Sequence, residues 1–266
     1  MQKIGEGVLS TAYLDGDSIT LVPKREGYFE KLKQLKVNID LVDGGIKTLQ
    51  VPSNAKLVAP CSDYPHGALT YLFVPGNVLK DCISGMTNKQ KVAIGKKLTA
   101  FITELQNLDI DFDKQAAIDS HVARLTRALP FIAPYLNATE NQKVQRIADL
   151  YPNFLQAREF CLTHGDLHLG NLIVNKGELT GVIDFGNLDF YVPEMELVGM
   201  MHQHGFTEKI FNAVLENYPN KIAMEDVKFL QLVHRIRYFK HSIYWDEATK
   251  VEEARKFRTL LAAFVR

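Results

Sequence analysis

Residues 160–187 read FCLTHGDLHLGNLIVNKGELTGVIDFGN, and this stretch decides the fold. Short apolar runs separated by turn residues predict three strands, Glu159–Thr163, Leu172–Val174 and Thr180–Asp184. Polar residues follow or precede these strands: Asp166, Asn171 and Asp184. Because strand ends and turns can aim side chains at a common point, we expect these three polar groups to lie together.

The three groups have the chemistry that phosphoryl transfer requires. Mg²⁺ prefers oxygen ligands and uses few protein carboxylates beside phosphate oxygens, so Asn171 and Asp184 are the candidate metal ligands. Asp166 is the candidate catalytic base for an attacking hydroxyl. An Asp two residues after a His, an Asn five residues later and then Asp-Phe-Gly is the order found in kinases. We expect His164 to support this loop by bonding backbone near Asp184.

The bulk properties of the chain exclude several other classes. The 266 residues carry equal numbers of acidic and basic side chains, so no basic excess points to nucleic acid. No apolar run is long enough to span a membrane, and the N-terminus lacks the pattern of a secretory signal. Three cysteines without metal-ligand spacing argue against a disulfide framework or a zinc site. We therefore expect a cytoplasmic enzyme, a monomer or weak dimer, that acts on a small molecule.

In the first third of the chain, apolar and polar residues alternate as they do in β-strands. Predicted strands are Ile4–Leu14, Ser18–Pro23, Thr48–Val51, Lys56–Pro60 and Ala68–Val74, with a short helix over Tyr28–Lys36. After Pro75-Gly76 the apolar period changes to that of helices. Thr87 and Gln90 form a predicted capping box, and the helix they open buries a stripe of Val92, Leu98, Phe101, Ile102 and Leu105.

Most of the remaining sequence has helical periodicity. The predicted helices are Ser120–Leu129, Thr139–Leu155, Glu194–His204, Thr207–Asn217, Glu225–Tyr244 and Lys250–Phe264. The expected class is α+β, with an antiparallel β-rich N-terminal lobe at residues 1–75, a hinge at 76–86 and a mostly helical C-terminal lobe at 87–266.

The segments HGDLHLGN (164–171) and VIDFGN (182–187) resemble the aminoglycoside phosphotransferase and choline kinase superfamily, the small-molecule relatives of protein kinases. Protein kinases usually carry Arg in place of Gly165 and an Ala-Pro-Glu segment, which this sequence lacks. Residues 193–197, PEMEL, resemble the family's P-x-x-D-L element, with Glu196 in the Asp position. The resemblance implies a two-lobed, protein-kinase-like fold and an ATP- or GTP-dependent kinase that requires Mg²⁺.

The N-terminal segment GEGVLSTA (5–12) has the position of a loop that covers nucleotide phosphates. Gly5 and Gly7 allow backbone N–H groups to approach phosphate, and Ser10 and Thr11 add hydroxyl donors. Relatives often place Lys or Arg two residues before a Pro on the next strand, where this chain has Leu21 before Pro23. Lys24 is the substitute that we favour over Arg25, with Glu30 as its expected partner.

The resemblance also locates the nucleotide base and the acceptor. In the family the adenine ring bonds the hinge backbone, which corresponds here to Tyr71–Phe73. A polycationic aminoglycoside would need carboxylates, and the candidates are Asp189, Glu194, Glu196, Asp246 and Glu247. A quaternary ammonium such as choline would need aromatic rings, and Trp245 lies near Tyr238, Phe239 and Tyr244.

Three functional hypotheses follow. The first is a small-molecule kinase, with an aminoglycoside-like antibiotic as the favoured acceptor and antibiotic resistance as the consequence; choline, thiamine, a sugar or a macrolide are further acceptors. The second is a protein kinase, against which Gly165 and the missing Ala-Pro-Glu segment argue. The third is a nucleotide-binding pseudokinase, which is motivated by Leu21.

Overall fold

The computed structural model describes residues 1–7, 9–202, 207–219 and 221–264. Contacts divide the chain into two compact units. Unit 1 consists of Met1–Leu108, His164–Asp189 and Gln203–Pro219, and unit 2 consists of Asp109–Thr163, Phe190–His202 and Asn220–Arg266. Unit 1 therefore combines the N-terminal sheet with the whole HGD-to-DFG segment.

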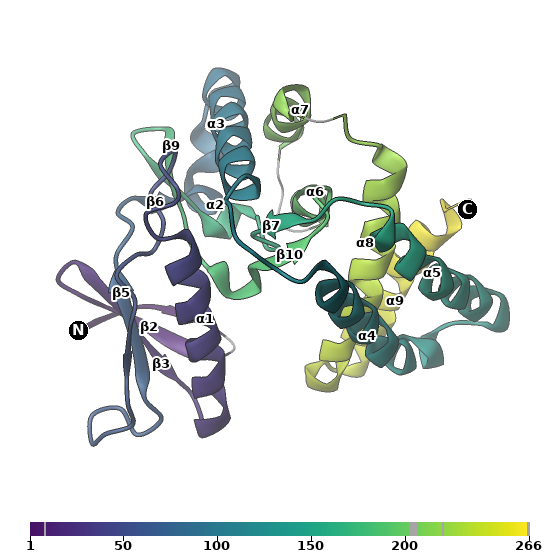
Figure 1. The fold of residues 1–266 in the computed structure, drawn as a ribbon, viewed down its shortest axis with the longest axis horizontal. Coiled ribbons are helices and arrows are strands. Elements are labelled where there is room, and N and C mark those ends of the chain that lie inside the picture. The colour runs from purple at the N-terminus through teal and green to yellow at the C-terminus, as the bar shows by residue number, and fades with distance from the viewer. Residues whose placement is uncertain (8, 203–206, 220, 265–266) are drawn as a thin grey trace. The chain divides into compact units, whose positions relative to one another are not determined.

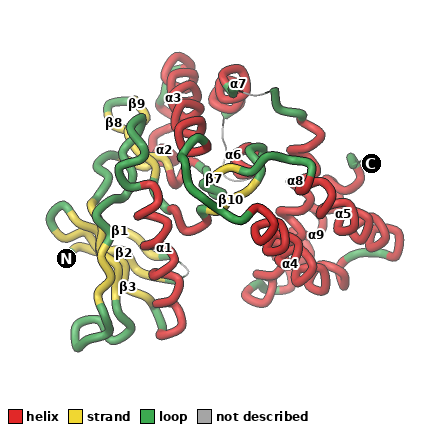
Figure 2. Tube along the Cα trace, viewed as in Figure 1, coloured by secondary structure: helices red, strands yellow, loops and turns green. Residues whose placement is uncertain are grey.

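An antiparallel sheet with strand order β1-β2-β3-β5-β4 forms the N-terminal part of unit 1 (Figures 1 and 2). Its strands are β1 Gln2–Glu6, β2 Ser10–Asp15, β3 Ser18–Pro23, β4 Lys56–Val58 and β5 Ala68–Leu72. The single predicted strand Ile4–Leu14 is wrong, because the chain reverses within it. Gly7 N donates to Ser10 O, and Gln2 then pairs with Leu14. β2 and β3 form an antiparallel hairpin, with Gly16 in its turn at φ 63°.

Helix α1, Phe29–Val42, lies against this sheet (Figure 1). Its buried Leu32 and Ile39 pack with Ala55 and Leu69, and Leu21 joins the cluster from β3. The helix extends six residues beyond the predicted end at Lys36, because Ile39 and Val42 continue its buried face. The predicted strand Thr48–Val51 is reduced to one isolated bridge, in which Gln50 meets Gly181.

A second small sheet with order β6-β8-β9 carries the catalytic segment. Its strands are β6 Asn77–Val78, β8 Leu172–Asn175 and β9 Glu178–Val182. The short helix α2, Leu79–Cys82, directly follows β6 in the chain. Leu172 pairs with Val182. The antiparallel hairpin therefore brings the residue before β8 beside the residues after β9, and Ile183 N donates to Asn171 O at 2.9 Å.

The helices α3, Asn88–Gln106, and α7, Glu208–Asn217, pack side by side in unit 1 (Figure 1). The Thr87–Gln90 capping box is confirmed. Leu98, Phe101, Ile102 and Leu105 are fully buried as predicted, whereas Val92 is half-buried. Gly95 sets the close approach of the pair, since a Cβ atom there would lie 2.6 Å from the Ile210 carbonyl oxygen.

Unit 2 is mostly helical. Its elements are α4 Lys114–Ile132, α5 Ala138–Gln156, β7 Cys161–Thr163, α6 Met195–His202, α8 Met224–Tyr238 and α9 Glu247–Ala262, together with β10 Asp189–Tyr191, whose first residue belongs to unit 1. The predicted helix Glu225–Tyr244 is wrong at its end, where Phe239–Tyr244 tightens into a 3₁₀ helix. The predicted helix Glu194–His204 has its predicted end outside the described residues. Among the described residues, no helix combines the length and apolar character needed to cross a membrane.

We predict that Gly95→Val destabilises the protein by about 2 kcal/mol or more, because overpacking a close helix contact costs roughly 1–3 kcal/mol. The matched control is Gly85→Val, since a Cβ atom at Gly85 meets nothing within 4 Å. Urea unfolding of both variants measures the difference. Equal free energies of unfolding for the two variants would contradict the close α3–α7 contact.

Candidate active site

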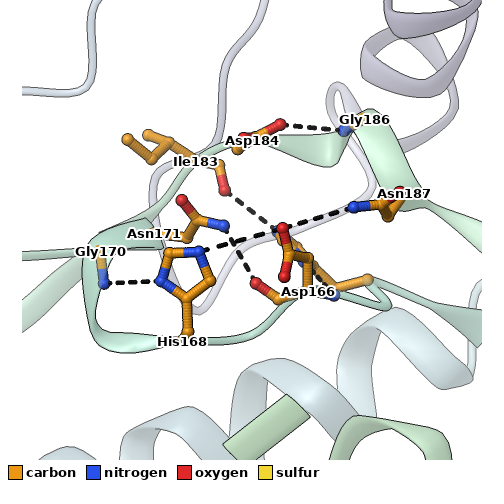
Figure 3. Close-up of polar contacts among 9 residues, drawn as sticks. Asp166, His168, Gly170, Asn171, Ile183, Asp184, Gly186 and Asn187 are labelled. Carbon is orange, nitrogen blue, oxygen red and sulfur yellow. Dashed lines mark hydrogen bonds and ion pairs between the residues drawn. The ribbon is translucent and has the colours of Figure 1, made fainter. Parts of the chain in front are cut away.

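Asp166 is the centre of the site, and polar groups surround its carboxylate and backbone (Figure 3). Asn187 Nδ2 donates to Asp166 Oδ2 at 3.3 Å, and His168 Nε2 lies 3.9 Å from the same oxygen. Asn171 Nδ2 donates to the Asp166 backbone carbonyl at 3.0 Å. The side chain of Asp166 is 28% exposed, so a substrate hydroxyl can reach it while its orientation is held from within.

His164 ties the start of the loop to the DFG segment. Its ring is fully buried and packs against the Phe185 ring at 4.7 Å between centroids. The Asp166 backbone N–H donates to His164 Nδ1 at 3.3 Å, and His164 Nε2 lies 3.1 Å from the Ile183 carbonyl oxygen. These partners require the neutral tautomer with hydrogen on Nε2. Burial lowers the pKa of His164 to about 4, against the opposing effect of the Asp184 charge.

His168 orders the loop between Asp166 and Asn171. Its Nδ1 accepts from Gly170 N at 2.9 Å, and Asn171 N donates to the His168 carbonyl. With Nδ1 as acceptor, Nε2 carries the hydrogen and faces the Asp166 carboxylate. The amide of Asn171 is buried, and its nitrogen is committed to the Asp166 carbonyl. That bond fixes the amide so that Oδ1 is its remaining metal-ligating atom.

Asp184 follows β9 in a left-handed backbone conformation, with φ 65° and ψ 68°. Non-glycine residues rarely adopt this region, and they do so mostly where the surroundings impose it. Its Oδ1 accepts from Gly186 N at 3.3 Å, while the residue as a whole is exposed. One exposed carboxylate and one oriented amide oxygen at the same end of a hairpin fit a Mg²⁺ ion that keeps water and phosphate ligands.

Gly165 allows the loop to approach the DFG turn. Its φ is 74°, and a Cβ atom there would lie 2.7 Å from the Asn187 carbonyl oxygen. Any side chain at this position, including the Arg of protein kinases, would meet both backbone strain and a clash with this turn. This backbone geometry explains why the chain has glycine at position 165, where protein kinases usually carry Arg.

The predicted phosphate loop lies between β1 and β2, but its nearby charges pair differently from the prediction. Lys24 Nζ contacts Glu6 Oε1 at 2.9 Å, and the expected partner Glu30 contacts Lys33 instead. The predicted Lys24–Glu30 pair is therefore wrong. Lys24 lies just beyond the end of β3 at Pro23, whereas Leu21 lies within that strand. Hydrogen bonding to Lys3 and Lys24 lowers the pKa of Glu6 to about 2.

The predicted hinge positions have contrasting surroundings. Phe73 N donates to the Asp17 carbonyl at 2.8 Å, so in this structure Phe73 has its carbonyl rather than its N–H to offer a nucleotide base. The Tyr71 side chain packs against the cluster under α1. Burial, together with the negative charge of Asp184, raises the pKa of Tyr71.

Four of the predicted acceptor residues differ in accessibility. Asp189 in unit 1 is half-buried. In unit 2, Glu196 is only 1% exposed, which is inconsistent with direct contact to a substrate, and the prediction for this residue is corrected on that ground. Glu194 has a buried Oε2 without a hydrogen-bond partner in the described part of the chain. Trp245 packs against Tyr238 and Phe239, with ring centroids 4.9 and 5.7 Å apart.

The model of the phosphotransferase enzyme family matches residues 4–230 of this chain. The chain belongs to that family. The match covers nearly all of the N-terminal sheet, the HGD-to-DFG segment and the first half of α8, so this phosphotransferase carries the family's sequence pattern through both units. No curated protein matches it in sequence.

Solved structures of similar fold include three whose coverage is nearly complete. Aminoglycoside phosphotransferase APH(2'')-Ib with ADP has 18% identity and a TM-score of 0.74 over 100% of this chain and 94% of that chain. The GDP and kanamycin complex of APH(2'')-IIIa has 17% identity and a TM-score of 0.75, with 99% and 93% covered. Macrolide 2'-phosphotransferase MphH from Brachybacterium faecium has 14% identity and a TM-score of 0.62, with 96% and 91% covered. These likenesses establish the kinase-like fold of the phosphotransferase.

Two asparagines of the phosphotransferase site were missed in the sequence. Asn187 was quoted only as part of a motif, although it bonds Asp166. Asn38 lies two residues beyond the predicted end of the first helix at Lys36, and it is 3% exposed and bonds the DFG turn. For Asn38, a polar residue interrupting the apolar stripe of α1 was the available signal.

We predict that His164 makes the stability of the phosphotransferase depend on pH. Its folded pKa of about 4 lies below the ordinary value of 6.5, so the unfolded chain binds the proton more tightly. Stability is therefore full above about pH 6.5 and is lost as pH falls toward 4, by on the order of 3 kcal/mol.

Urea unfolding between pH 4 and 7.5 measures this effect in wild type and in His164→Gln. In His164→Gln the free energy of unfolding should fall less as the pH is lowered. In His66→Gln, in the loop before β5, it should fall as much as in wild type. A slope that persists in His164→Gln would assign the pH dependence to other groups.

Proposed function

We propose that this phosphotransferase transfers the γ-phosphoryl group of ATP or GTP to a hydroxyl of a small molecule, with an aminoglycoside-like antibiotic as the favoured acceptor. The observation that carries the proposal is the position of Asp166 beside the Asn171–Asp184 end of one hairpin. A base for the hydroxyl and two oxygen ligands for a metal then face one reacting centre.

The proposed reaction uses these residues in distinct roles. The acceptor oxygen attacks the γ-phosphorus, the bond from that phosphorus to the β,γ-bridging oxygen breaks, and the hydroxyl proton passes to Asp166. Asn187 and His168 hold the carboxylate in its orientation. Asn171 and Asp184 would hold Mg²⁺, which supplies charge neutralisation for the phosphates when bound. His164 keeps the two segments together without carrying charge at neutral pH.

Nucleotide binding is proposed for the loop after β1 and for the hinge. Gly5 and Gly7 would bring backbone N–H groups to the phosphates, and Ser10 and Thr11 at the start of β2 would add hydroxyls. Lys24 would add positive charge from beside this loop, where Glu6 holds it. The Phe73 carbonyl and the Tyr71 backbone are the proposed base contacts. ADP, GDP and ATP occur in structures of similar fold, so we propose both ATP and GTP as phosphoryl donors.

The acceptor proposal rests on charge and on fold. Structures of similar fold include gentamicin and kanamycin complexes of other phosphotransferases. A polycationic acceptor would be attracted by Asp189 and by Glu194, whose buried Oε2 lacks a partner in the described structure. The rings of Trp245 and Tyr238 favour a second class, a quaternary ammonium such as choline. Sugars, thiamine and macrolides complete the set that we would test.

We predict that Asp184→Asn abolishes Mg²⁺-dependent transfer and that Asp166→Ala lowers turnover by roughly 10²–10⁴-fold, the usual contribution of a general base. The assay follows ATP or GTP consumption with a panel of aminoglycosides, choline, thiamine, sugars, macrolides and peptides. Asp149→Asn on α5 is the matched control, because it changes the same functional group at an exposed site.

Near-wild-type turnover of Asp184→Asn would exclude its metal role. Labelling of peptides without labelling of small molecules would favour a protein kinase. Nucleotide binding without any transfer in wild type would favour a pseudokinase, the alternative that Leu21 motivates.

A further inference from the structure

A polar residue, Asn38, is buried in the middle of α1. The rest of the buried face of this helix is apolar, formed by Leu32, Ile39 and Val42. Asn is a poor helix former, and a buried amide without partners is unfavourable. Asn38 is nevertheless only 3% exposed. Such a departure from local preference indicates that a specific interaction compensates for it.

The partners of Asn38 fix its amide in one orientation. Its Nδ2 donates to the Phe185 carbonyl oxygen at 2.7 Å, and its Oδ1 accepts from Gln34 Nε2 at 3.0 Å. A carbonyl can only accept, so the nitrogen must face Phe185. Gln34 lies one turn earlier on the same helix and supports that orientation.

The Phe185 carbonyl is a well-placed point from which to hold the DFG turn. It directly follows Asp184, whose left-handed backbone needs support from its surroundings. The same carbonyl accepts Leu188 N at 3.2 Å, which closes the turn over Phe185–Asn187. Asn187, at the end of this turn, then donates to Asp166. The Asn38 side chain therefore bonds the turn that follows Asp184, the proposed metal ligand. The other end of that turn is Asn187, which bonds the proposed base Asp166.

The contacts of Leu21, Lys24 and Glu30 show why the Asn38 hydrogen bond is important. Leu21 stands where relatives often place a cation, and it packs into the apolar cluster with Leu32. Lys24 pairs with Glu6, and Glu30 pairs with Lys33. The polar contact that joins α1 to the DFG turn is thus a neutral one.

We propose that Asn38 is a positioning residue, which holds the Asp184–Asn187 turn from α1 so that the Asp184 carboxylate is set for its metal. This role rests on the proposed function for its meaning, because it acts through Asp184. Loss of the donor would release the Phe185 carbonyl and let the Asp184 backbone leave its left-handed conformation. Metal-dependent nucleotide binding should then weaken, while contacts made by the phosphate loop and hinge stay the same.

The test compares full-length wild type with Asn38→Leu, which keeps side-chain volume but removes the donor. A matched control is Asn141→Leu in unit 2, which removes an amide that donates to the Ala133 and Leu136 carbonyls. Binding of a fluorescent ATP or GTP analogue is titrated at several Mg²⁺ concentrations without an acceptor. Amide hydrogen exchange at Gly186 and Leu188 is followed in parallel, without nucleotide.

We expect Asn38→Leu to raise the Mg²⁺ concentration for half-maximal nucleotide binding by about tenfold, the effect of losing one good hydrogen bond. Metal-free nucleotide affinity should change by less than about threefold, and exchange at Gly186 and Leu188 should accelerate. Asn141→Leu should leave the Mg²⁺ dependence and both exchange rates unchanged, whatever its effect on unfolding.

Wild-type Mg²⁺ dependence in Asn38→Leu would overturn the positioning role, and so would unchanged exchange at both amides. If wild type binds nucleotide but phosphorylates no acceptor, the proposed function fails while the Mg²⁺ comparison still decides the role of Asn38. If wild type binds no nucleotide at all, the proposed function fails, and unchanged exchange in Asn38→Leu would overturn the contact itself.

Discussion

The pairing of Leu172 with Val182 is the constraint on which the site depends. Because the hairpin is antiparallel and tightly turned, its open end brings Asn171 beside Ile183 and so beside Asp184. Neither residue could be moved without shifting the register, and a one-residue slip would reverse the faces of both strands. The hairpin thus places the two proposed metal ligands, Asn171 and Asp184, at the same end of one element.

Hydrogen bonds from uncharged side chains attach the Asp166 segment to this hairpin. His164 joins the Asp166 backbone to Ile183, Asn171 holds the Asp166 carbonyl, and Asn187 holds its carboxylate. These contacts fix the loop and the orientation of the carboxylate, which suits the proposed role of Asp166 as a base. The same preference for neutral contacts extends to Asn38 and the DFG turn.

Much of this arrangement could be predicted from the sequence, because short-range patterns determine it. The capping box at Thr87 and the strand-end positions of Asp166, Asn171 and Asp184 follow from local chemistry. Helix ends were less predictable, since tertiary burial extended α1 to Val42. The reversal inside Ile4–Leu14 was missed because apolar residues continue through a glycine turn.

Long-range pairings could not be predicted, because a sequence pattern does not specify which distant groups meet. Glu30 was a reasonable partner for Lys24 by position, yet Glu6 at the end of β1 contacts it instead. Glu196 had the right charge for a cationic acceptor, but the fold buries it. Asn38 lies beyond the predicted helix end at Lys36, and its partner, the Phe185 carbonyl, is 147 positions away.

The central claim is that Asp166, Asn171 and Asp184 form a metal-dependent phosphoryl-transfer centre. The most direct measurement is ³¹P nuclear magnetic resonance of a mixture of the protein, Mg²⁺, ATP or GTP and kanamycin. We predict a new phosphomonoester signal on the acceptor that grows as the γ-phosphate signal of the nucleotide falls, and that stops on addition of EDTA. Release of inorganic phosphate alone, or phosphomonoester formation that continues in EDTA, would contradict the account.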